Sequence, residues 1–157
     1  MTLYDYNGVM TKRAATPVRF DPDVAIRLAA FVAANPGLSL SSAANLLVDE
    51  GLRMGDHPGI VFRPGATGRR AGLAAGPDVW EIVRALKLAK EAEPELSADE
   101  LLELIAGNTD VPVAWLKRAT RYWASYREEI DAEVAAADAA EEEAEEAWRR
   151  QQQLLAG

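Results

Sequence analysis

Residues 16–54, TPVRFDPDVAIRLAAFVAANPGLSLSSAANLLVDEGLRM, decide the fold of this chain. The run from Ala14 to Phe20 alternates in character, and a period of two residues is typical of a β-strand. Val18 and Phe20 share one side of this strand. The other side carries Arg13, Ala15, Pro17 and Arg19. The pattern predicts a short strand with one apolar face.

Two helices are predicted after the strand. Asp21 is placed to act as an N-cap with Pro22 at the first helical position, and Asn35-Pro36-Gly37 ends this helix. Its apolar stripe is Val24, Leu28, Phe31 and Val32. Ser39 or Ser41 caps the second helix. The second stripe is Leu40, Ala44, Leu47 and Val48.

One strand and two helices in about forty residues cannot bury these stripes alone, because small domains expose too much of their surface. A lone strand also leaves its backbone groups unpaired. A second copy of the chain would solve both problems, since two strands would form an antiparallel ribbon and four helices would close a shared core. The sequence therefore predicts a homodimer or a higher homo-oligomer.

This order of elements resembles the ribbon-helix-helix DNA-binding family. The resemblance rests on Val18-Arg19-Phe20 before Asp21-Pro22 and on the Gly37-x-Ser39-x-Ser41 turn. It implies that outward strand residues enter the major groove and that the second helix binds a phosphate through its N-terminus. The implied DNA-binding residues are Arg13 and Arg19 at base edges, Ser39 and Ser41 at the backbone, and Lys12 with Arg13 near phosphates. Ala15 and Pro17 depart from the polar residues expected on the outward face.

Charge is distributed unevenly along the 157 residues. The formal net charge is −8, but residues 1–70 hold eight basic and six acidic residues, whereas residues 128–157 hold two and ten. The predicted DNA-binding segment is thus mildly basic, which is compatible with DNA binding but is not a strong electrostatic footprint. The chain has no cysteine, no signal-peptide pattern and no apolar run of membrane-spanning length. We expect a cytoplasmic protein without metal or cofactor and without contact to a membrane.

The sequence divides into five segments. Residues 1–12 are expected to form a flexible arm, residues 13–54 the ribbon-helix-helix domain, and residues 55–75 a linker and β-hairpin. In the hairpin, Ile60–Arg63 and Arg69–Leu73 are the predicted strands. His57 is the only histidine, so a metal role is disfavoured. The turn from Gly65 to Gly68 lacks the Lys-Ser/Thr ending of a phosphate-binding loop.

Residues 76–127 are expected to form a helix-turn-helix-like domain of three helices. Gly76-Pro77-Asp78 begins the first helix, and Ser97 with Glu100 forms a capping box for the second. Gly107-Asn108 is expected to end the second helix, and Thr109 or Asp110 to cap the third, whose apolar face is Val113, Leu116, Ala119 and Trp123. The third helix is basic. Its Lys117, Arg118 and Arg121 form either a second DNA-binding surface or an ordinary solvated face.

Residues 128–157 are expected to form a long acidic helix that binds a partner. Ile130, Val134 and Ala137 continue an apolar stripe into a glutamate-rich run. The expected partner-binding residues are Trp148, Arg149, Arg150, Leu154 and Leu155. A tryptophan beside arginines is common in interfaces, although a solubilising tail remains the alternative.

The chain also resembles a group of actinobacterial VapB-type antitoxins over most of residues 14–135. This resemblance rests on His57-Pro58-Gly59-Ile60, Gly68-Arg69-Arg70-Ala71 and Gly76-Pro77-Asp78-Val79-Trp80. It implies an antitoxin that represses its own operon as a dimer on operator DNA. It further implies that the C-terminal part neutralises a PIN-domain ribonuclease toxin, with Arg149 or Arg150 offered to the acidic active site.

Two other functions stay open. The first is an adaptor that dimerises through the ribbon without specific DNA binding. The second is a free-standing transcriptional repressor. An enzyme is not expected, because the chain has one histidine, no cysteine, no nucleophile elbow and no phosphate loop. Accordingly, no catalytic residue and no small-molecule substrate are predicted.

Overall fold

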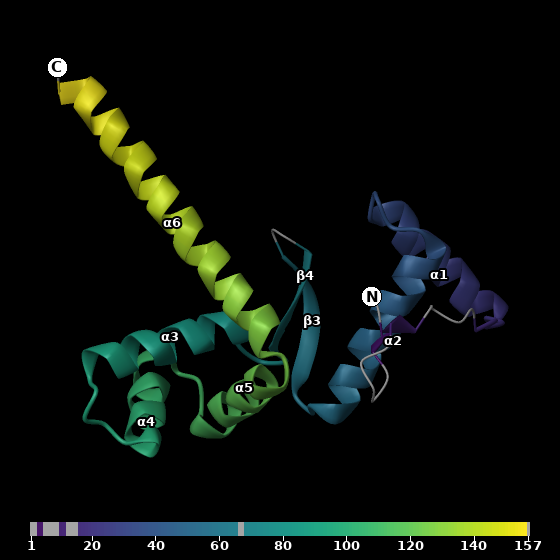
Figure 1. Cartoon of the computed structure of the whole chain (residues 1–157), viewed down its shortest axis with the longest axis horizontal. Coiled ribbons are helices and arrows are strands. Elements are labelled where there is room, and N and C mark those ends of the chain that lie inside the picture. The colour runs from purple at the N-terminus through teal and green to yellow at the C-terminus, as the bar shows by residue number, and fades with distance from the viewer. Residues whose placement is uncertain (1–2, 5–9, 12–15, 66–67, 157) are drawn as a thin grey trace. The chain divides into compact units, whose positions relative to one another are not determined.

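A computed structural model of the chain describes residues 3–4, 10–11, 16–65 and 68–156 (Figure 1). The described residues are mainly helical, with six helices and two small antiparallel sheets. The chain divides into two compact units, Met1–Leu47 and Val48–Gly157. The division falls within the helix of residues 40–56.

The first unit contains β1 (Leu3–Tyr4), β2 (Met10–Thr11), α1 (Pro22–Ala34) and the start of α2 (Leu40–Asp56). β1 and β2 pair antiparallel, although the sequence pattern predicts no strand in that segment. The ends of α1 agree with the sequence. Asp21 is its N-cap residue, Pro22 lies at the first helical position, and Asn35 is the C-cap.

Residues 16–21 belong to neither a helix nor a strand, so a strand over residues 14–20 is not confirmed. Ala14, Ala15, Lys12 and Arg13 lie outside the described residues. Residues 16–20 pair with no other strand among the described residues, and a ribbon between two chains needs a second copy. Val18 is 65% exposed and Phe20 is 39% exposed.

Very little of the first unit is buried. Leu28 and Ala43 are its buried apolar side chains among the described residues, whereas Phe31 and Val32 are half-buried. The large apolar side chains that stay exposed are Val18, Phe20, Val24, Ile26 and Leu40. This unit therefore has amphipathic helices without a completed core.

The second unit contains the end of α2 and six further elements. These are β3 (Ile60–Gly65), β4 (Gly68–Leu73), α3 (Val79–Ala92), α4 (Ala98–Thr109), α5 (Val113–Ser125) and α6 (Arg127–Ala156). α3 packs against α4, α5, α6 and β4, and α5 packs against both strands. The hairpin and the helices thus share one core.

The β3–β4 hairpin is tight and regular. Ile60 pairs with Leu73 at its open end, and Gly65 pairs with Gly68 at its tip. The strands therefore continue beyond Arg63, where the sequence pattern ends the first strand. Arg69 Nε donates to Glu50 Oε1 at 2.7 Å, and this ion pair connects α2 to the hairpin.

The core of the second unit lies between the hairpin and the helices. Its largest fully buried side chains are Tyr122, Leu73, Leu116, Ile130 and Val79. Tyr122 is absent from the face that the sequence predicts for α5. The predicted Trp123 is only half-buried, and its Nε1 donates to Asp131 Oδ1 at 2.8 Å.

The helix ends around α4 agree only in part with the sequence. Ser97 and Glu100 form the predicted capping box, with Glu100 N donating to Ser97 Oγ and Ser97 N donating to Glu100 Oε2. The hydrogen bonds that the Ser97 hydroxyl and the Ser97 backbone N–H donate to the Glu100 carboxylate lower the pKa of Glu100. The prediction for the other end was wrong, because α4 runs through Gly107 to Thr109 and ends at Asp110, whose φ is +57°. Pro112, not Thr109 or Asp110, is the N-cap residue of α5.

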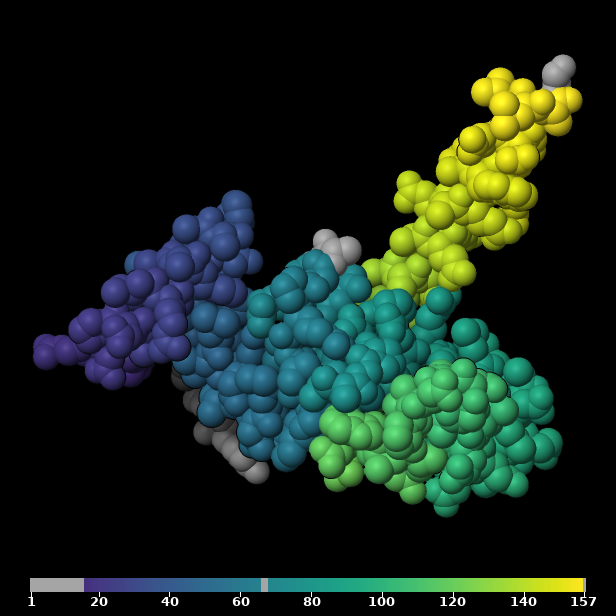
Figure 2. Space-filling model, turned by 180° about the vertical axis from the view of Figure 1, so that it is seen from behind, coloured from purple at the N-terminus to yellow at the C-terminus, as the bar shows by residue number. Residues whose placement is uncertain are grey.

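α6 is long and leaves the body of the second unit part-way along its length. Ile130 and Val134 are buried, whereas every described residue from Asp138 onward is exposed. Arg84 on α3 pairs with Asp138 at 2.6 Å and also with Glu141. Figure 2 shows the remaining, yellow part of α6 extending beyond this body. No helix within the described residues is long and apolar enough to cross a membrane.

Candidate binding surfaces

The N-terminus of α2 is open to solvent and free of acidic residues. Ser39 is its cap, since Ser42 N donates to Ser39 Oγ and Ser39 N donates to Ser42 Oγ, both at 3.1 Å. Ser41 lies in the first turn, and Ser39 and Ser41 are both exposed. A helix N-terminus with exposed amides and no carboxylate in its first turn favours an anion such as a phosphate.

Arg19 precedes α1 and is exposed. It is the only basic residue among the described positions 16–21. Lys12 and Arg13, the other predicted DNA-binding residues of the strand, lie outside the described residues.

The basic residues of α5 are partly engaged within the chain. Lys117 Nζ lies 3.4 Å from Asp99 Oδ1, and Arg121 Nε donates to the Lys117 carbonyl at 3.3 Å. Arg118 donates to the Pro58 carbonyl at 2.9 Å, and its guanidinium lies 4.8 Å from the centre of the Trp115 ring. Arg118 therefore has a structural role that neither interpretation of the sequence includes.

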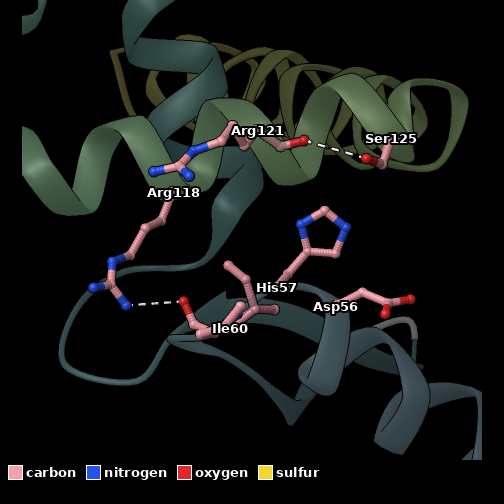
Figure 3. Close-up of a pocket in the computed structure, with 7 residues that line it drawn as sticks. Asp56, His57, Ile60, Arg118, Arg121 and Ser125 are labelled. Atoms are coloured by element: carbon pink, nitrogen blue, oxygen red, sulfur yellow. Dashed lines mark hydrogen bonds between the residues drawn. The ribbon is translucent and has the colours of Figure 1, made fainter.

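A cavity of about 240 Å³ opens between the end of α2, the start of the hairpin and α5 (Figure 3). Its lining includes Asp56, His57, Ile60, Arg118, Arg121 and Ser125. Sequence patterns did not indicate this cavity, since its residues come from segments more than fifty positions apart. The one local signal is the Pro58-Gly59 turn, which brings His57 under α5.

An aromatic and charged cluster lies behind the cavity. His57 contacts the edges of the Tyr122 and Tyr126 rings, with centroid distances of 5.1 and 5.7 Å. Arg53 donates to Tyr122 Oη at 3.1 Å and to Glu129 Oε2 at 2.8 Å. Burial raises the pKa of Tyr122 although the hydrogen bond from Arg53 opposes this shift. The phenol is therefore a neutral, fixed support for the imidazole.

Glu133 on α6 is a half-buried carboxyl in the same unit. Its Oε2 is buried and has no hydrogen-bond partner within the described residues. Burial, helped by the negative charge of Glu129, raises the pKa of Glu133 to about 7. This carboxyl is therefore only partly ionised near neutral pH.

The end of α6 carries the predicted partner-binding residues. Trp148 is 59% exposed and Leu154 is 81% exposed, and Leu155 is exposed as well. Arg149 pairs with Glu145 at 2.6 Å and Arg150 with Glu146 at 3.4 Å, in each case one helical turn earlier. The structure thus places apolar and cationic groups together on a helix that nothing covers among the described residues.

Within the described residues, no three histidine, cysteine, aspartate or glutamate side chains are grouped as a metal site. Comparison of the chain with protein families, curated proteins and solved structures finds no significant match.

Proposed function

We propose that this protein is a dimeric DNA-binding antitoxin that represses its own operon and neutralises a ribonuclease toxin. In this proposal residues 13–54 of two copies form a ribbon-helix-helix head on operator DNA. The C-terminal part of α6 binds the toxin. The protein acts by binding and not as an enzyme.

The observation that carries the proposal is the unfinished core of the first unit. Five large apolar side chains stay exposed there while Leu28 and Ala43 are buried. Each large aliphatic or aromatic side chain that becomes buried contributes about 1.5–3 kcal/mol, so association with a second copy would be strongly favoured. A strand from each copy would also supply the ladder partners that residues 16–20 do not find among the described residues of one chain.

DNA binding is supported by charge and by the start of α2. The exposed N-terminus of α2, with Ser39 and Ser41, suits a backbone phosphate, and Arg19 suits a base edge. A dimer presents each of these groups twice. Because phosphate contacts release counterions, the affinity would fall steeply as salt is raised.

Toxin binding is supported by the exposed end of α6. Trp148 and Leu155 are seven residues apart and so lie on one face of the helix. The ion pairs of Arg149 and Arg150 with the preceding glutamates are exposed, and such pairs stabilise a helix by only about 0.3–0.5 kcal/mol each. Either arginine can therefore leave its glutamate for a partner's carboxylates at little cost.

The DNA-binding part of the proposal is tested with the duplex upstream of the protein's own gene. Wild type should bind it in preference to a scrambled duplex, and Arg19→Ala should weaken this binding by about tenfold or more, because one base-edge contact is lost at each half-site. Arg27→Ala is the matched control, since Arg27 donates to the Asp23 carbonyl of its own helix. Equal affinity for both duplexes at every salt concentration would refute operator binding.

The toxin-binding part is tested by co-expression with the neighbouring reading frame. A small ribonuclease should co-purify with the wild type, and Trp148→Ala should reduce its recovery and its inhibition. Normal inhibition by Trp148→Ala together with Leu155→Ala would remove α6 from the toxin interface. Repression without any co-purifying toxin would identify a free-standing repressor.

A second function, an adaptor that dimerises without specific DNA binding, is favoured by one observation. Pro17 and Ala15 lie at outward positions of the predicted strand, which leaves Arg19 as the only basic residue of positions 16–21. For an adaptor, Arg19→Ala would leave all functions intact, whereas disruption of the dimer would abolish them.

A further inference from the structure

The cavity between the start of the hairpin and α5 is lined by two arginines that keep unused hydrogen-bond donors, whereas the Ser125 hydroxyl donates to the Arg121 carbonyl at 3.4 Å. Arg118 uses one N–H group on the Pro58 carbonyl, and Arg121 uses one on the Lys117 carbonyl. Their other guanidinium N–H groups have no partner among the described residues. The His57 ring and the Ser125 hydroxyl also line this space.

Two of these groups are fixed in place before any ligand arrives. The Trp115 ring and the Pro58 carbonyl hold the Arg118 guanidinium, and two tyrosine rings hold His57. Gly59 has a φ of +95°, and a Cβ at this position would lie 2.6 Å from Arg118 NH1. The turn is therefore shaped so that the arginine can lie against it. Such preorganisation reduces the entropy lost on binding.

The charge of the lining favours an anion. The lining contains two guanidinium groups and one carboxylate, that of Asp56. Figure 3 shows Asp56 on the far side of His57 from both guanidinium groups. This positive site is unusual in a chain with a net charge of −8. Donors that approach from several directions match a tetrahedral oxyanion better than a planar carboxylate, which accepts side by side from one arginine.

The size of the cavity limits what can enter. Sites for drug-sized molecules are typically about 300–1,000 Å³, and this cavity of about 240 Å³ is smaller. One phosphoryl group fits this limit, whereas a complete nucleotide would have to leave its base and sugar outside.

We propose that this cavity is a binding site for a single phosphoryl group, held by Arg118, Arg121 and His57. The phosphoryl group belongs either to a nucleic-acid backbone or to a small phosphate-bearing molecule. The site lies in the second unit, so it does not depend on the ribbon-helix-helix head and has its own test.

The test is a titration of the isotope-labelled full-length protein with inorganic phosphate, followed by NMR at constant ionic strength with chloride as reference. Amide signals of residues 57, 59, 60, 118 and 121 and the guanidinium signals of Arg118 and Arg121 should shift saturably with phosphate and not with chloride. Arg121→Gln changes an exposed side chain and should weaken phosphate binding about tenfold, because a charge-assisted hydrogen bond is lost.

Arg127→Gln is the matched control. Arg127 lies over the Trp123 ring and near Asp131, outside the cavity, so this variant should bind phosphate as the wild type does. Gly59→Ala is a second, charge-neutral variant that should weaken binding by displacing Arg118. Absence of a saturable shift, or equal binding by Arg121→Gln and Arg127→Gln, would overturn the proposal.

A second arm identifies the source of the phosphoryl group. A duplex of arbitrary sequence would assign the site to a nucleic-acid backbone if it shifts the same signals at a lower concentration of phosphate groups than inorganic phosphate requires. Shifts with inorganic phosphate alone would assign it to a small phosphate-bearing molecule. Both results support the site, and neither depends on operator binding through Arg19.

Discussion

The two units of this chain both contain amphipathic helices, but only the second unit has a closed hydrophobic core. In the second unit, helices and a hairpin enclose fully buried residues such as Tyr122, Leu116 and Ile130. In the first unit, α1 buries Leu28 and leaves Val24 and Ile26 exposed. The difference shows that helix-forming sequence alone does not make a core, because each apolar stripe also needs a surface to cover it.

The largest expected effect comes from Tyr122→Ala, which should strongly destabilise the second unit. Removal of this fully buried ring would leave a cavity and would also remove the ring that His57 packs against. Such truncations lower the free energy of unfolding by about 3–5 kcal/mol. The measurement is urea unfolding of the full chain. Trp148→Ala removes an exposed aromatic side chain and is the control, so it should leave the midpoint nearly unchanged.

A somewhat smaller effect is expected from Phe20→Asp, which tests whether the first unit is completed by a second copy. A charge on this apolar surface should weaken dimerisation by at least about tenfold, as measured by analytical ultracentrifugation. The unfolding midpoint of the second unit should not change. A wild type that stays monomeric at all concentrations would contradict the intersubunit core.

Loss of one helix cap should have an effect of about 1 kcal/mol, and the chain offers a matched pair for it. Ser97→Ala removes the cap of α4 and should lower the stability of the second unit by this amount. Ser39→Ala removes the equivalent bond at α2 and should leave the second unit's transition in place. If both variants shift the same transition equally, the two units unfold as one.

The smallest effect is expected from Glu133→Gln, and it depends on pH. The folded state raises the pKa of Glu133 to about 7, above its value in the unfolded chain, so wild-type stability falls as pH rises through about 4.5–7. The variant lacks this ionisation. It should be more stable than wild type above pH 7, and the difference should vanish below about pH 4.5.

Thermal melts at several pH values would measure this difference. The side chain is only half-buried, so solvent screening keeps the gain small. The matched control is Glu128→Gln, which alters an exposed carboxyl on the same helix. A pH-independent gain in Glu133→Gln would mean that packing, and not ionisation, causes it.

Local chemistry explains which features the sequence predicts well. The capping box of Ser97 and Glu100, the Asp21-Pro22 helix start and the β3–β4 hairpin depend on neighbouring residues, and the structure has all three. The acidic C-terminal helix follows from its composition in the same way.

Tertiary contacts explain what the sequence does not predict. Tyr122 and Trp123 are adjacent, and helical spacing alone allows either to face the core. The choice of Tyr122 is explained by its contacts with Arg53 and His57, which lie about seventy positions earlier. α4 passes through Gly107 because Ile105 is buried and Thr109 Oγ1 donates to its carbonyl. The cavity beside Arg118 is likewise formed by distant segments, so no local motif marks it.

Among the described residues, the ion pairs of Arg84 with Asp138 and Glu141 are the last contacts that hold α6 to the body of its unit. The fifteen residues from Glu142 to Ala156 are then about as long as the shortest peptides that stay helical in water. Amide hydrogen exchange should therefore accelerate stepwise past Glu141, with the fastest rates at the last turn. A molecule that binds Trp148 must also offset the free energy of ordering this frayed helix. A helix-stabilising substitution in residues 142–147 should therefore raise the affinity for that molecule without contacting it.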